Sequence, residues 1–307
     1  MQIPMIFGVN LPNYSSLGNR DAMVAIAERA EALGYSSLWT SDHILVPKDR
    51  PEPFGNVLES FTTLSYLAAC TEHIRLGTGI LVLPQRNPLL AAKQAATIQH
   101  LSGGRLTLGV GVGYIEEEYG YLRADFGSRG RLADEYIPAM RELFESDAPE
   151  FQGEHVSYAD ALFAPRPKVP IPIVVGGNSP GALKRAAKLG DGWYGLRLSP
   201  ESARVAIATM HELGHQEDFA LSLRVQTRIG GTVDDVQPEA TLHGEAGEII
   251  EQVNRYAAVG VQHLVIEPLS SNLPDFLEQL ERFAGEIAPR VAATGNSERL
   301  DPAAPNA

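Results

Sequence analysis

The chain contains a single cysteine, Cys70, among its 307 residues. One thiol cannot form an intrachain disulfide, so the fold must rest on a packed core, and an oxidising compartment gains no support. The chain also lacks an apolar run close to the roughly 20 residues that a membrane-spanning helix needs, and no charged-then-apolar leader follows Met1. From these absences we expect a cytoplasmic protein.

Positive charge is also scarce. Lys and Arg number 25 against 38 Asp and Glu, which gives a net charge of -13. This charge argues against a nucleic-acid or membrane partner, because anionic surfaces repel it. What the chain does have is an ordinary globular composition, with 44% hydrophobic residues. We therefore expect a large core and a small-molecule substrate.

The stretch from residue 74 to residue 114 shows the organisation of the chain. Ile74–Leu83 is an apolar, β-branched run typical of a strand that is buried on both faces. A helical pattern starts at Pro88 and stops at Ser102-Gly103-Gly104, and a second apolar run, Leu106–Val112, follows. Two such strands are parallel and end at the same rim. Glycines at the strand ends, where a backbone can approach a ligand closely, are Gly77, Gly79, Gly109, Gly111 and Gly113.

The same alternation of strand and helix runs through the whole chain. The expected strands are Ile3–Leu11, Ser37–Thr40, Ile74–Leu83, Leu106–Val112, Ile173–Val175, Trp193–Leu196, Ala220–Ile229 and His263–Glu267. Nearly every strand precedes a helical pattern, which predicts an α/β protein with a parallel sheet. Eight units favour a closed (β/α)8 TIM barrel, with an open doubly wound sheet as the alternative.

The domain boundaries follow from composition. Residues 1–290 form one predicted domain, and residues 291–307, polar and aperiodic, form a predicted disordered tail. Residues 148–172 contain five prolines and little periodicity, so we expect a surface excursion with a short hairpin at Phe151–Tyr158.

Two short motifs carry candidate chemistry. Gly176-Gly177-Asn178-Ser179 lies between a strand and a helix, where exposed N–H groups and the helix dipole favour an anion such as phosphate; the alternative is a glycine turn with an N-cap. Ser41-Asp42-His43 follows another strand. Adjacent residues of an extended chain face opposite ways, so these three cannot form a triad with one another. Asp42 or His43 can still face the end of the barrel where catalytic groups gather.

Two other motifs are coincidental by their context. His211 to His215 matches the zinc pattern HExxH, but it ends an outer helix, contains Gly214 and has no third ligand, so we predict no metal site. The glycines from Gly109 to Gly113 resemble a dinucleotide fingerprint, but they lie in the fourth unit and inside an apolar run.

Three longer segments, Ala27–His43, Leu76–Tyr119 and Ile173–Gly195, resemble the bacterial luciferase-like flavin and deazaflavin oxidoreductases. The resemblance runs from about Ile3 to Ala288, and the Ser-Asp-His triplet and the GVGxxxEE turn are most similar to the branch that uses coenzyme F420. It implies a homodimeric TIM barrel with the ring at its mouth and a cis peptide at Gly79-Ile80. The cofactor-binding residues that it implies are Asp42, His43, Thr78, Gly79, Ile80, Gly111, Gly113, Gly176, Gly177, Asn178 and Ser179.

Tyr114 departs from one group of these relatives. The sugar-phosphate dehydrogenases of the family resemble GTGE at this point, and their glutamate acts as a catalytic acid. A tyrosine supplies no carboxylate, so that substrate class is disfavoured. The Tyr114 hydroxyl can instead donate a hydrogen bond to a carbonyl, or its ring can stack on a planar substrate.

The resemblance predicts an F420-dependent oxidoreductase that moves a hydride between the deazaflavin C5 and a small organic substrate. His43 is the expected proton carrier, since histidine changes charge near neutral pH, and Tyr114 is the second catalytic candidate. One alternative is an FMN-dependent monooxygenase served by a partner reductase, and another is a barrel that binds a ligand without turnover. We expect the substrate contacts to come from two loops, Ile44–Asn56 and Ala148–Pro172.

Overall fold

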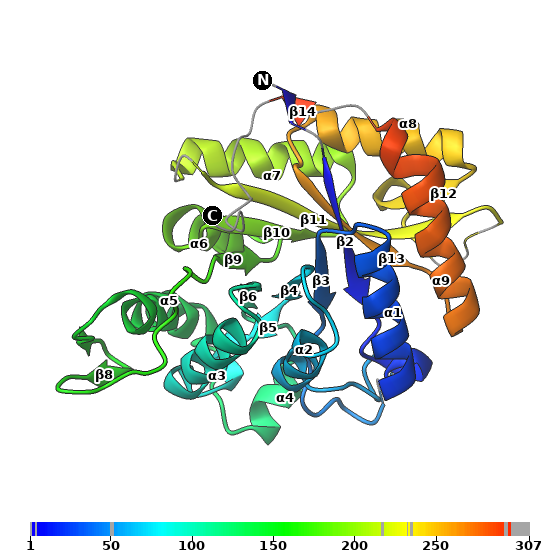
Figure 1. Cartoon of the computed structure of the whole chain (residues 1–307). Helices are drawn as coiled ribbons and strands as arrows, with labels where there is room; N and C mark the ends of the chain where they lie inside the picture. The colour runs from blue at the N-terminus through cyan, green and yellow to red at the C-terminus, as the bar shows by residue number, and fades with distance from the viewer. Residues whose placement is uncertain are drawn as a thin grey trace, which may run out of the picture.

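The computed structural model describes residues 2–3, 5–49, 52–215, 218–231, 233, 236–291 and 294–295. Parallel strands close into a barrel, and helices surround it (Figure 1). The order around the barrel is β10, β9, β6, β4, β3, β2, β13 and β11, and β10 pairs with β11 to complete the ring. The predicted eight-stranded TIM barrel is therefore confirmed. The strands are β2 Ile6–Leu11, β3 Ser37–Thr40, β4 Arg75–Thr78, β6 Leu106–Gly111, β9 Ile173–Gly176, β10 Gly192–Leu196, β11 Ala220–Ile229 and β13 His263–Pro268.

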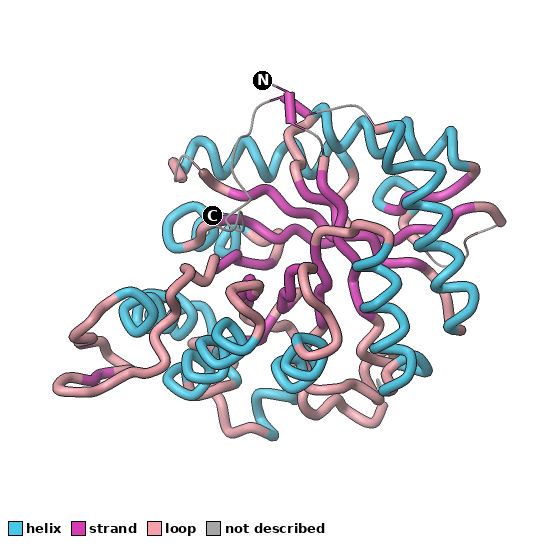
Figure 2. Tube along the Cα trace, viewed as in Figure 1, coloured by secondary structure: helices cyan, strands magenta, loops and turns pink. Residues whose placement is uncertain are grey.

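The helices pack outside the strands, as the tube in Figure 2 shows. Several begin at an Asn or Ser whose side chain accepts a main-chain N–H, as Asn19, Asn87 and Ser199 do. Within the described ranges, no helix is long and apolar enough to cross a membrane. The helices are α1 Arg20–Ala32, α2 Ser60–Ala68, α3 Pro88–Leu101, α4 Glu116–Tyr121, α5 Arg129–Glu145, α6 Pro180–Leu189, α7 Pro200–Leu213, α8 Ala246–Ala258 and α9 Leu273–Arg282.

The barrel interior has a small aromatic core of its own, separate from the large core between strands and helices. The rings of Trp39 and Tyr194 pack together there in a tilted arrangement, with centroids 4.6 Å apart, and Ile80 packs against them. Gly77 makes room for this pair, because a Cβ at that position would lie 2.5 Å from the Trp39 ring. Trp39 therefore forms a middle layer between the two ends of the barrel.

The apolar run Ile74–Leu83 is not one strand, which corrects the prediction. β4 ends at Thr78, the Gly79-Ile80 peptide is cis as the resemblance implied, and β5, Leu81–Val82, then pairs with β6. The break turns the Ile80 side chain toward two glycines. A Cβ on Gly111 or Gly176 would lie 2.5 or 2.4 Å from Ile80. These two glycines thus accommodate the Ile80 side chain.

The excursion before β9 contains the predicted hairpin, formed by β7 Phe151–Gln152 and β8 Ser157–Tyr158. It links the end of α5 to the start of β9, so it lies at the amino end of the strands, and Figure 1 shows β8 projecting beyond α5. The expectation that residues 148–172 supply substrate contacts beside the strand ends is therefore wrong, because the carboxyl ends of the strands lie at the opposite face.

Other segments add to the predicted pattern. β12, Thr241–Gly244, extends the sheet beside β11, and the acidic stretch that begins at Glu116 is the helix α4. α9 continues into a π turn, Phe283–Ile287. Most of the predicted disordered tail lies outside the described residues; within it, the backbone of β14, Thr294–Gly295, pairs with β1, Gln2–Ile3.

Candidate active site at the carboxyl end of the barrel

The predicted catalytic pair meets at the carboxyl end of the strands, which we call the mouth. His43 follows β3 and Tyr114 follows β6; their rings make an edge contact with centroids 5.9 Å apart. Phe54 stacks on the other side of the histidine, at 4.1 Å. The His43 side chain is only 7% exposed, so its imidazole is held in a fixed position by its contacts with two aromatic rings.

Glu118 on α4 is the third neighbour of His43, and the sequence did not single it out. Its Oε2 lies 2.9 Å from His43 Nδ1, and its Oε1 accepts the N–H of Ile44 at 3.0 Å. Burial by itself would raise the pKa of the Glu118 carboxyl. The hydrogen bond and charge of His43, together with nearby main-chain N–H groups, nevertheless bring this pKa below its ordinary value. The carboxylate is therefore ionised at neutral pH.

Asp42 faces a different partner. Its two oxygens receive a forked pair of hydrogen bonds from Arg86, both at 2.7 Å, and Oδ2 also accepts the N–H of Val82 at 2.8 Å. The side chain is completely buried. Asp42 thus ties the end of β3 to β5, directly beside the cis peptide, and the structure gives its carboxylate a supporting position at the mouth.

A buried ion pair between β11 and β13 is a further part of the mouth that sequence reasoning missed. Arg224 donates to Glu267 through Nη2 at 2.8 Å and Nε at 3.1 Å, and Arg197 also reaches this carboxylate, at 3.1 Å. Burial raises the pKa of Glu267, but the arginines outweigh it and lower that pKa to about 2. The sequence offered one signal for this pair, because Arg224 and Glu267 are charged residues inside otherwise largely apolar strands.

The ion pair is tied to the loops above it. Arg224 Nη1 donates to the Ser41 hydroxyl at 3.2 Å, and the Tyr14 hydroxyl donates to Glu267 at 2.9 Å. Ser41 directly precedes Asp42, and Tyr14 follows β2. The network therefore fixes the loops after β2 and β3 relative to β11 and β13.

The floor of the mouth carries two buried polar atoms for which the described residues supply no hydrogen-bond partner. The Tyr194 hydroxyl and Asn10 Oδ1 are buried and make no hydrogen bond within the part of the chain that the structure describes. Tyr194 lies over Trp39 and beside Gly79, where a Cβ would stand 2.8 Å from its hydroxyl. Buried polar atoms of this kind normally need a partner, so the floor suits a flat ligand with a polar edge.

The predicted phosphate loop lies where β9 gives way to α6. Ser179 caps the helix by accepting the N–H of Ala182, and Asn178 makes two hydrogen bonds to the backbone of Leu196. The Gly177 N–H donates to the carbonyl of Tyr194 at 3.2 Å. Asn178 and Ser179 are exposed, and the positive end of the α6 dipole is open to an anion.

The remaining predicted cofactor residues surround the break between β4 and β5. Thr78 donates its hydroxyl to the carbonyl of Gly109 at 2.6 Å. Gly113 has a φ of 61°, and a Cβ there would lie 2.7 Å from Val82. Both residues therefore shape the strand ends under the mouth.

The HExxH segment lies apart from this site. His211 Nδ1 and His215 Nε2 are 3.0 Å from each other at the end of α7. Among the residues that the structure describes, no three metal-ligating side chains come together.

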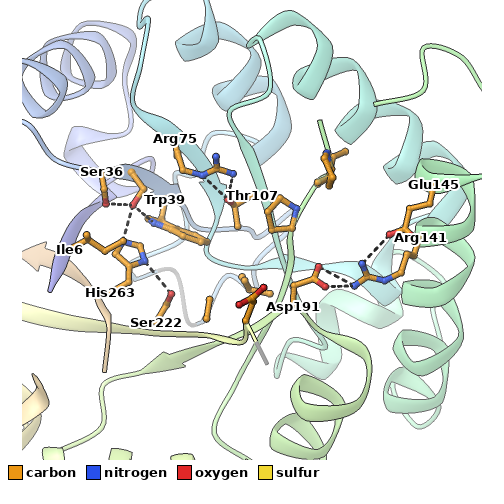
Figure 3. Close-up of a pocket in the computed structure, with 17 residues that line it drawn as sticks. Ile6, Ser36, Trp39, Arg75, Thr107, Arg141, Glu145, Asp191, Ser222 and His263 are labelled. Carbon is orange, nitrogen blue, oxygen red and sulfur yellow. Dashed lines mark hydrogen bonds and ion pairs between the residues drawn. The ribbon is translucent and has the colours of Figure 1, made fainter. Parts of the chain in front are cut away.

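A cavity of about 740 Å³ occupies the opposite, amino end of the barrel (Figure 3). His263 lies on its wall near Trp39, with its two ring nitrogens beside the hydroxyls of Ser37 and Ser222 at 2.9 and 3.1 Å. Burial lowers the pKa of His263 to about 3, so its imidazole is neutral. Active sites of such barrels lie at the carboxyl end, so this cavity is not the candidate active site.

The comparisons with known proteins agree with this architecture. The family model described as luciferase-like monooxygenase matches residues 5–258. An uncharacterized protein of Mycobacterium tuberculosis is 35% identical over 229 residues, which cover 70% of this chain and 79% of the relative. The F420-dependent glucose-6-phosphate dehydrogenase of Amycolatopsis mediterranei is 27% identical and covers 91% of this chain, with 96% of its own length aligned.

Two solved structures have the same fold. An F420-dependent secondary alcohol dehydrogenase, solved with an F420-acetone adduct, matches with a TM-score of 0.80 at 19% identity, over 94% of this chain and 100% of the other. The oxygenating constituent of 3,6-diketocamphane monooxygenase of Pseudomonas putida, solved with FMN, matches with a TM-score of 0.77 at 16% identity, over 95% of this chain and 100% of the other. At these identities, the likeness concerns the barrel alone.

Proposed function

Since the chain belongs to the luciferase-like monooxygenase family, we propose that it is an F420-dependent oxidoreductase acting on a small, largely apolar alcohol or carbonyl compound. The observation that carries the proposal is the buried His43–Glu118 pair at the mouth. Transfer of a hydride to or from a carbon–oxygen bond also requires a proton to move, and this pair supplies a proton carrier. A relative that aligns with 91% of the chain is named as F420-dependent, which favours the deazaflavin.

The residues of the mouth suit a tricyclic ring. The Tyr194 hydroxyl and Asn10 Oδ1 would receive the polar edge of the ring, and Ile80 would support its face. The exposed start of α6, with Asn178 and Ser179, would meet a phosphate. When bound, F420 supplies the hydride chemistry at C5, and the protein supplies orientation and exclusion of water.

His43 carries the proton in this scheme. When a substrate alcohol is oxidised, its C–H hydrogen leaves as a hydride and its hydroxyl proton passes to Nε2 of His43, so that a neutral carbonyl forms. In the reverse direction, Nε2 returns the proton to the oxygen of the reduced carbonyl. Tyr114, whose ring touches His43, would donate a hydrogen bond to the same oxygen.

Apolar side chains around the mouth support the substrate class. Ile44 and Leu45 follow β3, Tyr114 follows β6 and Leu196 ends β10; their exposed fractions are 41%, 54%, 69% and 42%. Exposed apolar side chains beside a buried polar site are typical of a ligand pocket. We therefore propose that an apolar substrate body lies against them.

A titration with each coenzyme tests the proposal. The full chain is titrated with F420 and, separately, with FMN, while the intrinsic fluorescence of Trp39 and Trp193 is followed; the Trp39 ring lies against Tyr194. Oxidation of reduced F420 is then assayed with small ketones and with a sugar phosphate. We expect saturable binding of F420 and turnover of ketones. Binding of FMN alone would instead support the monooxygenase with a partner reductase, and binding without turnover would support a ligand-binding barrel.

We also propose that the protein is a homodimer. Tyr66 on α2 and Leu89 and Leu90 on α3 are exposed apolar side chains on neighbouring outer helices, and such patches often mark an interface. Light scattering of the full chain would test this, and a monomer at micromolar concentration would contradict it.

A further inference from the structure

We propose that Glu118 is a positioning residue that fixes His43 in one tautomer, with the proton on Nδ1 and the lone pair of Nε2 directed to the substrate. The inference rests on the proposed function for its catalytic consequence. The tautomer itself is a property of the protein without ligand, so it can be tested separately.

The two oxygens of Glu118 have different partners. Oε2 is 2.9 Å from His43 Nδ1, while Oε1 accepts the main-chain N–H of Ile44 at 3.0 Å. A carboxylate only accepts hydrogen bonds, so the shared proton belongs to Nδ1 of the neutral ring. Because Oε1 holds the residue that follows His43, the same carboxylate fixes both the ring and its backbone.

The aromatic neighbours restrict the ring in the remaining directions. Phe54 stacks on the imidazole with an interplanar angle of 28°, and Tyr114 meets it edge-on at 82°. A flipped ring would place a carbon beside Glu118 and leave a buried carboxylate oxygen without its hydrogen bond, which is costly. Of the two neutral tautomers, only the one with Nδ1–H can donate to Glu118 in this ring orientation.

α4 explains why one of three consecutive glutamates has this role. Glu116 and Glu117 are exposed, whereas the Glu118 side chain is 2% exposed. The neighbouring Tyr119 is fully buried and donates its hydroxyl to the carbonyl of Val112 at 2.6 Å. This contact fastens the short helix to the end of β6, with Glu118 turned toward His43.

The titratable groups that face His43 lie on α4 and on the loops after β3 and β6. From α4 it faces Glu118, and from the loop after β6 it faces the Tyr114 ring. Asp42, its neighbour in the chain, is held by Arg86. Glu118 is therefore the carboxylate that contacts the imidazole, and it stabilises the imidazolium when His43 takes a proton from a substrate.

The first test compares two identical substitutions on α4. Glu118→Gln keeps the size of the side chain but removes its charge, and Glu116→Gln makes the same change at the exposed position. We expect Glu118→Gln to lower kcat by about 10²-fold, within the usual range for acid–base groups. The pH midpoint of kcat should move to lower pH, because an amide stabilises imidazolium less than a carboxylate does. The Kd for F420 should stay within about twofold, Glu116→Gln should behave as the parent, and Glu118→Asp should recover part of the activity.

The second test does not depend on turnover. Nitrogen-15 NMR of the histidine rings in the parent protein reports which nitrogen carries the proton, and His43→Gln assigns the signal. We expect Nδ1–H. A neutral ring with Nε2–H, or Glu118→Gln with an unchanged pH profile and kcat, would overturn the proposal. If the parent protein fails to use F420 yet shows Nδ1–H, the proposed function fails while the positioning role stands.

Discussion

The buried ion pair at the mouth makes a quantitative prediction about stability. Glu267→Gln removes the carboxylate charge that Arg224 and Arg197 share, and leaves the buried Arg224 beside the hydroxyls of Tyr14 and Ser41. Breaking one partner of a buried pair typically costs about 3–5 kcal/mol, because the remaining charge has lost its counter-charge in a medium of low polarity.

The pKa of Glu267 gives a second route to the same magnitude. This pKa is lowered from its ordinary value of 4.5 to about 2, and the side chain is buried. A pKa shift of this size corresponds to about 3 kcal/mol of stability. A carboxyl group whose folded-state pKa is depressed contributes its full stability above the unfolded-state value. The contribution is therefore complete above about pH 4.5 and is lost as the pH falls toward about 2.

Urea unfolding of the full chain at several pH values between 7 and 3 is the assay. We expect Glu267→Gln to be less stable than the parent by about 3 kcal/mol at pH 7, with a difference that shrinks as the pH falls below 4.5. Glu201→Gln breaks an exposed pair with Arg204 on α7 and serves as the control, which should leave stability unchanged. A Glu267→Gln difference that is absent at pH 7, or that does not vary with pH, would refute the reasoning.

Three further predictions concern the same end of the barrel. His43→Ala should lower kcat by about 10²–10⁴-fold with F420 affinity nearly unchanged, because the ring moves a proton and does not hold the coenzyme; unchanged turnover in a steady-state assay would exclude this role. Gly176→Ala should destabilise the protein by about 1–3 kcal/mol, since its Cβ would lie 2.4 Å from Ile80. In urea unfolding, adding Ile80→Ala should restore part of this stability; additive losses in the double variant would argue against the clash. Asp42→Asn should lower the free energy of unfolding by about 2 kcal/mol, because it removes one of the two hydrogen bonds from Arg86 and the negative charge that accepts them. An unchanged stability in urea would mean that Glu59 takes over as the partner of Arg86.

The fold could be predicted closely because apolar runs and helix caps are local signals. The break after Thr78 could not be placed from composition, since the run from Ile74 to Leu83 stays apolar across it. The position of the excursion was available in the sequence. A segment that follows a helix and precedes a strand, as residues 146–172 do, must lie at the amino end of a parallel barrel.

The site was less accessible, because its contacts join residues that are far apart in the chain. Glu118 is one of three successive glutamates, and only the orientation of α4 shows which of them is buried. Arg224 and Glu267 stand 43 positions apart, and a single sequence does not show that they are partners. His43 could be found because it follows a predicted strand and because the resemblance marked it, while its hydrogen-bond partner required the structure.

The carboxylates at the mouth differ in their partners, and their pKa values are shifted in different directions. Asp42 and Glu267 are each held by arginine, which stays charged throughout the accessible range. The arginines lower the pKa of Glu267 to about 2, whereas burial outweighs Arg86 and raises the pKa of Asp42 above its ordinary value. Glu118 is held by His43, and the hydrogen bond and charge of that histidine help to bring the pKa of Glu118 below its ordinary value. The other histidine of the barrel interior, His263, stays neutral because its pKa is lowered to about 3. A pH profile of turnover that changes in Glu118→Gln but not in Glu116→Gln would therefore support the functional role of the contact between Glu118 and His43.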